Sequence, residues 1–455
     1  MPIINISKLK FSLLFFFPII SVYGADATST LYLSQELSMP SSQQIVLDKF
    51  AHDTSNQNQF WYWLDLAQLQ QTNGDYSTSI ASFEKAYGIL DEYENRAKIS
   101  LRNIGSTIGS SFFSKGTETF YGKGYERSLM HTLNAINYLM LNKFESAAVE
   151  MRRMEQRQEF WLQESADKLK KAAENKQKIM NQGTNIDQMP DGYSMSSLLN
   201  NSELRDVVNN YQDPFSYTLS SITSTLAFQT NVQNNVDFKR AVSLNPKAVQ
   251  VFENNFAKRT LPKSLKSKVT LIILSGQAPA YYTEKIRFPL FHQAEFSSLD
   301  VPAYRPAQND VSTITVQYGK TTIVPPRLLK SDIMAYKTLK DEFLSEFTKS
   351  VLRATSKAVT AKQFSDHFGP LGGFVASITL DATSSIMDSN YKNWELLPNS
   401  GYLLQFDIDT LQSPLYVHFN EQTAVLPLPD QIGKDIIILV SYISTNTIRI
   451  DHVTY

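Results

Sequence analysis

The clearest pattern of apolar and polar positions lies between residues 121 and 154, where hydrophobic residues recur every three or four positions on both sides of Asn142. The stretch before Asn142 is apolar nearly all round, which is typical of a helix buried between other helices. The stretch after it is apolar on one face, which predicts an amphipathic helix. These positions are Leu129, Leu133, Ile136 and Met140 before the turn and Phe144, Ala147, Ala148, Met151 and Met154 after it. We therefore expect a helical hairpin with a tight turn at Asn142-Lys143.

A second hairpin is predicted around Asn73-Gly74, because apolar residues at helical spacing precede and follow that turn. Gly74 and Asn142 lie 68 positions apart (142 − 74), which is twice 34. With its turn, aromatic and alanine positions, this period resembles the tetratricopeptide repeat, a helix pair that stacks on its neighbours. The resemblance implies a concave surface on which other chains bind. The matching residues are Trp63, Leu66, Gly74, Tyr76, Phe83 and Ala86 in the first copy, Ala135, Phe144 and Ala147 in the second, and Phe238, Ala241 and Pro246 in a weaker third.

After Pro262 the pattern changes to short runs rich in β-branched residues, separated by Gly and Pro, which is typical of strands. A long amphipathic stretch at 331–360 interrupts them and predicts a helix. The predicted strands are 269–274, 286–290, 311–318, 321–324, 402–408, 415–419, 423–426, 436–441 and 447–453. We therefore expect an α+β protein. Its predicted parts are a tetratricopeptide-like helical domain at 28–262, with a mobile linker at about 181–203, and an antiparallel β domain at 263–455 with a helical insertion at 331–398.

Residues 1–27 have the pattern of a secretory signal peptide. Lys8 and Lys10 precede a short apolar run at 11–20, and small residues then favour cleavage after Gly24 or Ala27. An uncleaved anchor is the alternative. Because no Cys follows the apolar run, we expect no lipid attachment there. The sequence predicts export to the periplasm or to an outer-membrane-associated position.

Residues 369–387 form the least polar stretch after this signal, and small residues at Gly369, Gly372 and Gly373 allow close helix contact. Two readings compete, a membrane-touching hairpin and a helix that packs on 331–360. The uncharged part is about half of what a membrane span needs, and Asp381 would lie inside the bilayer. We therefore expect a packed helical hairpin and no transmembrane helix after signal removal, while peripheral association with the envelope stays open.

Composition narrows the classes of function. The chain has no Cys, which excludes disulfides, thiolate metal sites and a Cys nucleophile. The formal net charge is −1, so the chain lacks the basic excess that drives nucleic-acid binding. The six His are scattered without metal-ligand spacing, and no Gly-x-Ser-x-Gly elbow is present. The sequence therefore predicts no catalytic residue, cofactor or metal site.

Five residues of the central hairpin are candidates for binding a partner: Arg127, His131, Glu150, Arg152 and Arg153. His131 lies in the predicted buried helix, where a histidine is more often a core residue whose ring nitrogens find partners. Arg152 and Arg153 beside Glu150 present guanidinium forks that could grip a partner carboxylate. The alternative is a local network of ion pairs that steadies the helix pair, and we favour it.

Several short motifs resemble a family of uncharacterised bacterial envelope proteins, usually lipoproteins, with a tetratricopeptide-like first half and a β-rich second half. The motifs are Tyr121-Gly122 with Tyr125-Glu126-Arg127, Val149-Glu150-Met151-Arg152-Arg153, Leu274-Ser275-Gly276-Gln277-Ala278-Pro279, Val301-Pro302-Ala303-Tyr304 and Trp394-Glu395-Leu396-Leu397-Pro398. The chain departs from the family in lacking the Cys that would carry the lipid. The resemblance implies an architecture and no known activity.

Together these features predict a periplasmic protein-binding scaffold, an accessory component of an envelope or secretion-related assembly, and not an enzyme. Its expected partners are proteins of the cell envelope. The alternative is an envelope hydrolase acting on peptidoglycan or a polysaccharide. Such an enzyme needs two carboxylates that meet in a cleft, and the sequence offers no pair to nominate.

Overall fold

The computed structural model describes residues 47–48, 51–52, 55–103, 120–181, 195, 199, 202–205, 207–232, 235–253, 262–289, 296–355, 394–411, 413–420, 422–444 and 447–455. The predicted signal peptide at 1–27, the predicted hairpin at 369–387 and most of the predicted linker at 181–203 lie outside these residues. Within that linker, Met195 and Leu199 are described, and both are buried in the main core.

The described residues of the first half are mainly helical, as predicted. Its helices are α3 (Phe60–Thr72), α4 (Tyr76–Asn103), α5 (Gly124–Met140), α6 (Phe144–Asn181), α8 (Pro214–Phe228), α9 (Val236–Leu244) and α10 (Gln250–Glu253), with short 3-10 turns at η1 (Ser202–Arg205), η3 (Pro246–Val249) and η4 (Lys263–Leu265). Gly74 joins α3 to α4 with φ +82°, and Asn142 joins α5 to α6 with φ 58°. Both adopt the left-handed conformation that Gly and Asn tolerate best, so the two predicted turns are confirmed.

In the second half, the described strands form three sheets. Its strands are β1 (Ser267–Gln277), β2 (Ala280–Pro289), β3 (Phe296–Arg305), β4 (Ile314–Tyr318), β5 (Thr321–Ile323), β6 (Arg327–Lys330), β7 (Pro398–Ile408), β8 (Leu415–Phe419), β9 (Gln422–Leu426), β10 (Ile436–Ser444) and β11 (Thr447–Thr454). Sheet A has the order β11-β10-β1-β7-β6, sheet B pairs β2 with β3, and sheet C has the order β5-β4-β8-β9. The α+β class is therefore confirmed.

One part of the predicted β arrangement is wrong. The sequence predicts one antiparallel β domain, but β1 and β10 are parallel neighbours in sheet A. Antiparallel neighbours can be joined by a short turn, whereas parallel neighbours need a long connection. Here the connection from Gln277 to Ile436 contains most of the second half, including sheets B and C and helix α11 (Ser331–Thr355).

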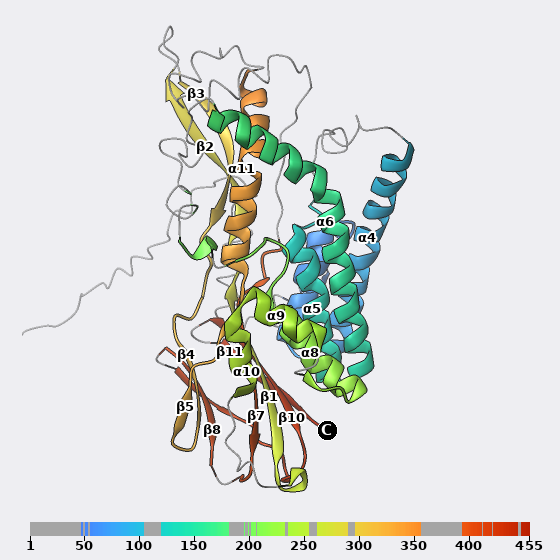
Figure 1. Ribbon diagram of the computed structural model, residues 1–455, viewed down its shortest axis with the longest axis vertical. Coiled ribbons are helices and arrows are strands. Elements are labelled where there is room, and N and C mark those ends of the chain that lie inside the picture. The colour runs from blue at the N-terminus through green and yellow to red at the C-terminus, as the bar shows by residue number, and fades with distance from the viewer. Residues whose placement is uncertain are drawn as a thin grey trace, which may run out of the picture.

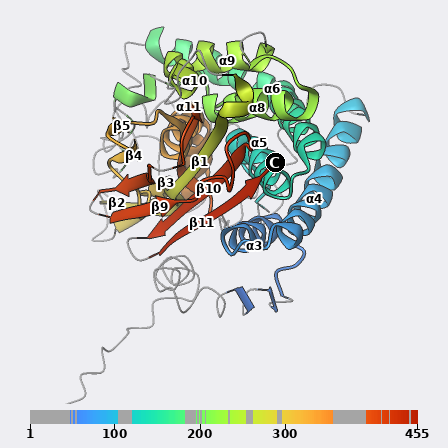
Figure 2. The same ribbon diagram turned by 90° about the horizontal axis from the view of Figure 1, so that it is seen from below.

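Sheet A lies between two hydrophobic cores, which explains why β1 and β10 are apolar on both faces. Alternate residues of β1 point to opposite sides. Val269, Leu271 and Ile273 pack in a core shared with sheet C. Ile272 and Leu274 pack in the larger core that sheet A shares with the helices. Figures 1 and 2 show the resulting order of layers, with helices α3 to α6 on one side of sheet A and sheet C on the other.

Polar contacts join the helical half to the last strand. The hydroxyl of Tyr76 donates to the Asp451 carboxylate at 2.8 Å, and Asp451 also accepts two hydrogen bonds from Arg449. The Arg449 guanidinium lies so close to Gly74 that a Cβ on that glycine would sit 2.1 Å from Nη2. The turn between α3 and α4 therefore rests directly on β11.

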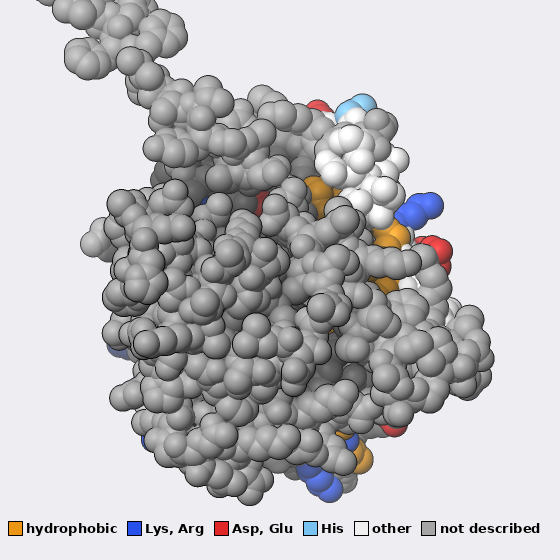
Figure 3. Space-filling view, turned by 90° about the horizontal axis from the view of Figure 1, so that it is seen from above, with side chains coloured by type: hydrophobic (Ala, Val, Ile, Leu, Met, Phe, Trp, Pro, Cys, Tyr) orange, Lys and Arg blue, Asp and Glu red, His pale blue; other side chains and the backbone are white. Residues whose placement is uncertain are grey.

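Helix α11 confirms the helix predicted at 331–360 as far as Thr355, and residues 356–360 lie outside the described residues. Its apolar residues Ile333, Leu339 and Phe343 lie in the main core. Figure 1 shows α11 beside β2 and β3. None of the helices in the described ranges is long and apolar enough to cross a membrane. On the face shown in Figure 3, the described side chains include acidic, basic and apolar groups side by side.

Candidate functional site

Four of the five predicted site residues lie in one group of charged and aromatic side chains between α4, α5 and α6. We call this group the His131 cluster. Its members are Tyr87, Asp91 and Glu94 from α4, Arg127 and His131 from α5, and Glu150, Arg153 and Arg157 from α6. Both predicted hairpins contribute to it, because α4 belongs to the first and α5 with α6 to the second.

His131 and Glu150 form the centre of the cluster, and both are buried. The Nδ1 atom of His131 lies 2.7 Å from Oε2 of Glu150. On the other side of the ring, Nε of Arg157 donates to Nε2 of His131 at 3.4 Å. Nε2 must then be the acceptor, so Nδ1 carries the proton and donates it to Glu150. The imidazole is also stacked on Tyr87, with 4.3 Å between ring centroids.

The pKa directions agree with a neutral histidine beside an ionised carboxylate. Burial lowers the pKa of His131, and the nearby guanidinium groups of Arg157 and Arg153 add to this effect. Burial alone would raise the pKa of Glu150, but hydrogen bonds from His131 and Tyr87 and the charge of Arg153 outweigh it and lower that pKa. The Tyr87 hydroxyl donates a hydrogen bond to Glu150 at 2.9 Å. Burial and the adjacent negative charge both raise the Tyr87 pKa.

Arg127 is buried in the same cluster but faces different partners. Its Nε donates to the backbone carbonyl of Tyr121 at 3.0 Å, and its Nη1 lies 3.6 Å from Glu94. The guanidinium carbon lies 5.0 Å from the ring centroid of Trp161, within the range of a cation–π contact. Glu94 also accepts a hydrogen bond from Arg157. Arg127 therefore holds the N-terminal end of α5 against α4 and α6.

The two remaining candidates reach the surface. Arg153 donates to Oε1 of Glu150 at 2.8 Å while 48% of its side chain is exposed. Arg152 is exposed and lies outside the cluster, with its guanidinium 5.7 Å from the ring centroid of Phe228 at the end of α8. The structure thus brings Glu150 together with Arg153 and places Arg152 on a neighbouring face of α6.

The His131–Glu150 pair resembles part of a catalytic triad, in which a carboxylate on Nδ1 orients the imidazole. In a triad, Nε2 faces a nucleophile. Here the Nε2 of His131 faces the guanidinium of Arg157. The geometry therefore supports the ion-pair network that we favoured over a partner-gripping site, because both ring nitrogens are engaged within the cluster.

A second buried group was missed by the sequence reasoning. Asp65 of α3 is fully buried, and its Oδ1 accepts the backbone N–H of Leu396 at 2.9 Å. Its Oδ2 has no hydrogen-bond partner among the described residues. Burial, followed by the negative charge of Glu395, raises the Asp65 pKa well above its ordinary value. The one available signal was a single charge inside the apolar run at 60–69.

Glu126 belongs to the same region and is also buried. Its Oε2 accepts the backbone N–H of Lys123 at 2.6 Å, which caps the N-terminus of α5. Burial raises the pKa of Glu126 to about 7, although the Lys123 backbone and the charges of Lys123 and Arg127 act against it. Glu126 adds to the rise in the Asp65 pKa, so two acidic side chains, Glu395 and Glu126, act on Asp65 where α3 and α5 meet the segment before β7.

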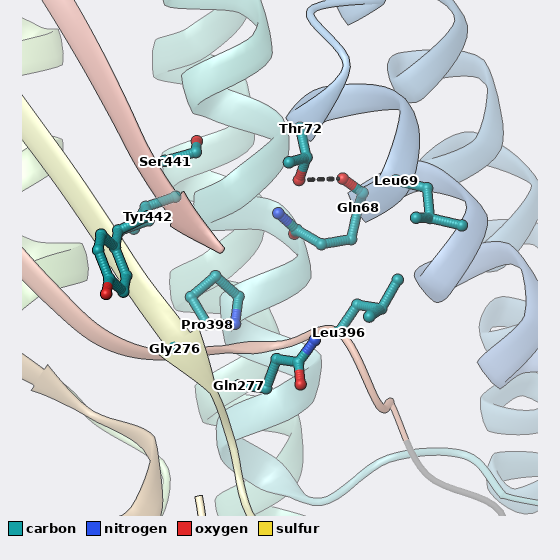
Figure 4. A pocket seen from close by; sticks show the side chains of 10 residues that line it. Gln68, Leu69, Thr72, Gly276, Gln277, Leu396, Pro398, Ser441 and Tyr442 are labelled. Atoms are coloured by element: carbon teal, nitrogen blue, oxygen red, sulfur yellow. Dashed lines mark hydrogen bonds between the residues drawn. The ribbon is translucent and has the colours of Figure 1, made fainter. Parts of the chain in front are cut away.

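A small cavity of about 40 Å³ lies near this junction, between α3 and the ends of β1 and β10. Figure 4 shows the side-chain amide of Gln68 directed toward it, with Leu396 and Pro398 on another side. A single water molecule needs a cavity of roughly 10–15 Å³. The cavity therefore has room for a few water molecules.

In the part of the chain that the structure describes, no group of three or more His, Asp or Glu side chains could hold a metal ion. Comparisons with known proteins give no relative. No protein-family model matches the chain, and neither a curated protein nor a solved structure shows significant similarity to it. The likeness to envelope proteins therefore rests on the short motifs of this sequence alone.

Proposed function

We propose that this protein is a periplasmic protein-binding scaffold, an accessory component of an envelope or secretion-related assembly, that binds its partner by strand addition to sheet C. The observation that carries this proposal is the edge strand β9. It pairs with β8 on one side, and no strand pairs with its other side among the described residues. Val425 in this strand is 63% exposed. An edge with free backbone groups and an apolar side chain is suited to an added strand of another chain.

The helical half supports the same proposal. We assign the pairs α3–α4 and α5–α6 to the tetratricopeptide-like class on their matching turns at Gly74 and Asn142 and on the 34-residue period. Apolar side chains remain exposed on this half, including Val149 of α6 and Phe228 of α8. With Arg152 beside Phe228, they offer a second face for a protein partner, because aromatic and Arg side chains are enriched at such interfaces.

The alternative function is an envelope hydrolase, and Asp65 with Glu395 is the acidic pair that it would use. A glycosidase needs two carboxylates on either side of the bond that is cleaved. Asp65 is fully buried, and the cavity bordered by Leu396 holds about 40 Å³, which is too small for a glycan. We therefore rank the hydrolase second.

The experiment that tests the scaffold places a photo-crosslinking amino acid at position 425 in cells. The matched control carries it at position 208, where Val208 is 62% exposed but lies outside sheet C. We expect a covalent adduct with an envelope protein from position 425 and none from position 208. Equal labelling at both positions would contradict strand addition at β9. Release of muropeptides by the purified protein, without any crosslinked partner, would favour the hydrolase.

Export has its own test. Mass analysis of the protein isolated from the cell envelope should find that the first 24 or 27 residues are missing. Protein found in the cytosol with Met1 intact would exclude the proposed location, and the function would then have to be sought among cytosolic partners.

A further inference from the structure

A second cavity lies between helix α8 and sheet A, and none of the residues that line it belongs to the His131 cluster or to the buried group around Asp65. Its volume is about 490 Å³, within the range of about 300–1,000 Å³ typical of small-ligand sites. One wall is the C-terminal end of α8 with the residues after it, including Gln229 and Asn231, and the opposite wall is the beginning of β1 and the end of β7. Phe252 of α10 closes one side. We call this cavity the α8–β7 groove.

The charges of the α8–β7 groove balance. Lys268 of β1 and Asp407 of β7 are directly opposite each other in the sheet register, and both are partly exposed. They are the charged residues that border the groove. The C-terminal end of α8 adds partial negative charge from its last carbonyl groups. An anionic ligand such as a phosphate would meet one cation beside a carboxylate and a negative helix end, which disfavours it.

The remaining lining is rich in groups that both donate and accept hydrogen bonds. Gln229, Asn231 and Gln405 contribute side-chain amides, each of which offers two donors and an acceptor. Gln405 is held in place, because its Nε2 donates to the Thr270 hydroxyl at 3.0 Å and the side chain is buried. An amide fixed in this way is pre-organised for hydrogen bonding to a ligand.

One aromatic ring completes the groove. Phe252 is partly buried and packs edge-to-face against Phe238, with 5.1 Å between centroids. Its position is therefore set by the protein core and not by a ligand. A flat apolar ring beside amides and a carboxylate matches a ligand that has an apolar face and hydroxyl groups along its rim.

We propose that the α8–β7 groove binds a neutral, hydroxyl-rich ligand, namely a short oligosaccharide. The Asp407 carboxylate accepts hydrogen bonds from sugar hydroxyls, and the Gln405 amide both accepts and donates them. Lys268 donates to a further hydroxyl, and Phe252 packs against the sugar ring. This site is separate from the strand edge at β9, and it does not depend on the scaffold function being correct.

The test uses the full-length mature protein and three neutral trisaccharides as probes: maltotriose, cellotriose and triacetylchitotriose. Binding is measured by ligand-observed NMR and by calorimetry at millimolar concentrations. We expect saturable binding of at least one probe and an increase in Kd of about tenfold or more for Asp407→Asn and for Lys268→Ala. The matched controls are Asp430→Asn and Lys434→Ala, which change exposed residues outside the groove and should leave Kd unchanged.

Each other outcome overturns the proposal. Failure of all three trisaccharides to bind the wild-type protein excludes an oligosaccharide site. Equal Kd values for Asp407→Asn and Asp430→Asn place the bound sugar elsewhere. Binding of the zwitterionic dipeptide dialanine in place of the sugars reassigns the groove to peptide ends. Thermal melting of each variant confirms that a loss of binding is not a loss of folding, and crosslinking at position 425 reports on the scaffold function independently.

Discussion

Replacing Glu126 with Gln tests how much a buried ionisable carboxyl group changes the stability of the folded protein. Glu126 is buried at the third position of α5, where its Oε2 accepts the Lys123 backbone N–H at 2.6 Å. Gln keeps an acceptor oxygen for this capping bond and removes the ionisable group. The substitution therefore isolates the free-energy cost of placing a negative charge in this environment.

The size of that cost follows from the pKa. Burial raises the Glu126 pKa from 4.5 to about 7, a change of about 7 − 4.5 = 2.5 units, and each unit corresponds to about 1.4 kcal/mol. A raised carboxyl pKa means that the folded protein holds its proton more tightly than the unfolded chain. This tighter proton binding stabilises the folded protein fully below pH 4.5, and the stabilisation is lost as the pH rises through 7. Above pH 7 the wild-type protein carries a penalty of at most about 3.5 kcal/mol.

We therefore expect Glu126→Gln to match the wild type near pH 4 and to be more stable at pH 8 by up to about 3.5 kcal/mol. The assay compares melting temperatures and urea unfolding of both proteins at the two pH values, so that effects of other ionisable groups cancel. Glu145→Gln is the matched control, because Glu145 is exposed in the first turn of α6. A difference between Glu126→Gln and wild type that is the same at pH 4 and pH 8 would refute this reasoning.

Three further predictions concern the turns and the His131 cluster. Urea unfolding should show that His131→Ala destabilises the protein by about 3 kcal/mol, because the change leaves Glu150 buried with fewer partners; a loss below about 1 kcal/mol would contradict a structural role for the pair. Gly74→Ala should destabilise the protein by about 1–2 kcal/mol because of its positive φ, and by a further amount because the new Cβ would clash with Arg449. In the double variant Gly74→Ala with Arg449→Ala, the destabilisation caused by the clash should disappear and that caused by the positive φ should remain, as a double-mutant cycle of melting measurements can verify. Asn142→Val should lose about 1–2 kcal/mol by the same backbone argument, whereas Asn142→Gly should melt close to wild type.

Local patterns predicted most of the described elements, but they missed strands β3 and β6 and the first half of β2. The turns at Gly74 and Asn142 and the helix beginning at Ser331 are visible as periodicity, because one face of each helix must be buried. The strands that alternate or run apolar, such as 436–441, are recognisable for the same reason. The pairing of β1 with β10 could not be predicted, because it joins residues 167 positions apart (436 − 269), such as Val269 and Ile436. Both strands are also apolar, and an apolar strand can pair with many different neighbours.

The contacts within the candidate site, too, could be predicted from the sequence only in part. Proximity of His131 to Glu150 follows from the hairpin between α5 and α6, so the sequence could place both residues in one group. Tyr87 and Glu94 come from α4, and their contacts depend on how the two hairpins pack. Asp65 and Glu395 lie 330 positions apart, and only the folded chain brings them together. Hydrophobic periodicity reports which face is buried, but it does not report which polar groups meet there.

The layers of the fold give a further constraint on the two proposed binding surfaces. The α8–β7 groove lies on the side of sheet A that faces the helices. Neighbouring residues of a strand point to opposite faces, and Val269 and Leu404, which are next to Lys268 and Gln405, pack against sheet C. The edge strand β9 belongs to sheet C, on the opposite side of sheet A. Packed sheets are about 10 Å apart, so a strand added to β9 and a sugar in the groove would not touch. The two proposed sites can therefore be occupied at the same time, and competition between a protein partner and an oligosaccharide would indicate that one site is misplaced.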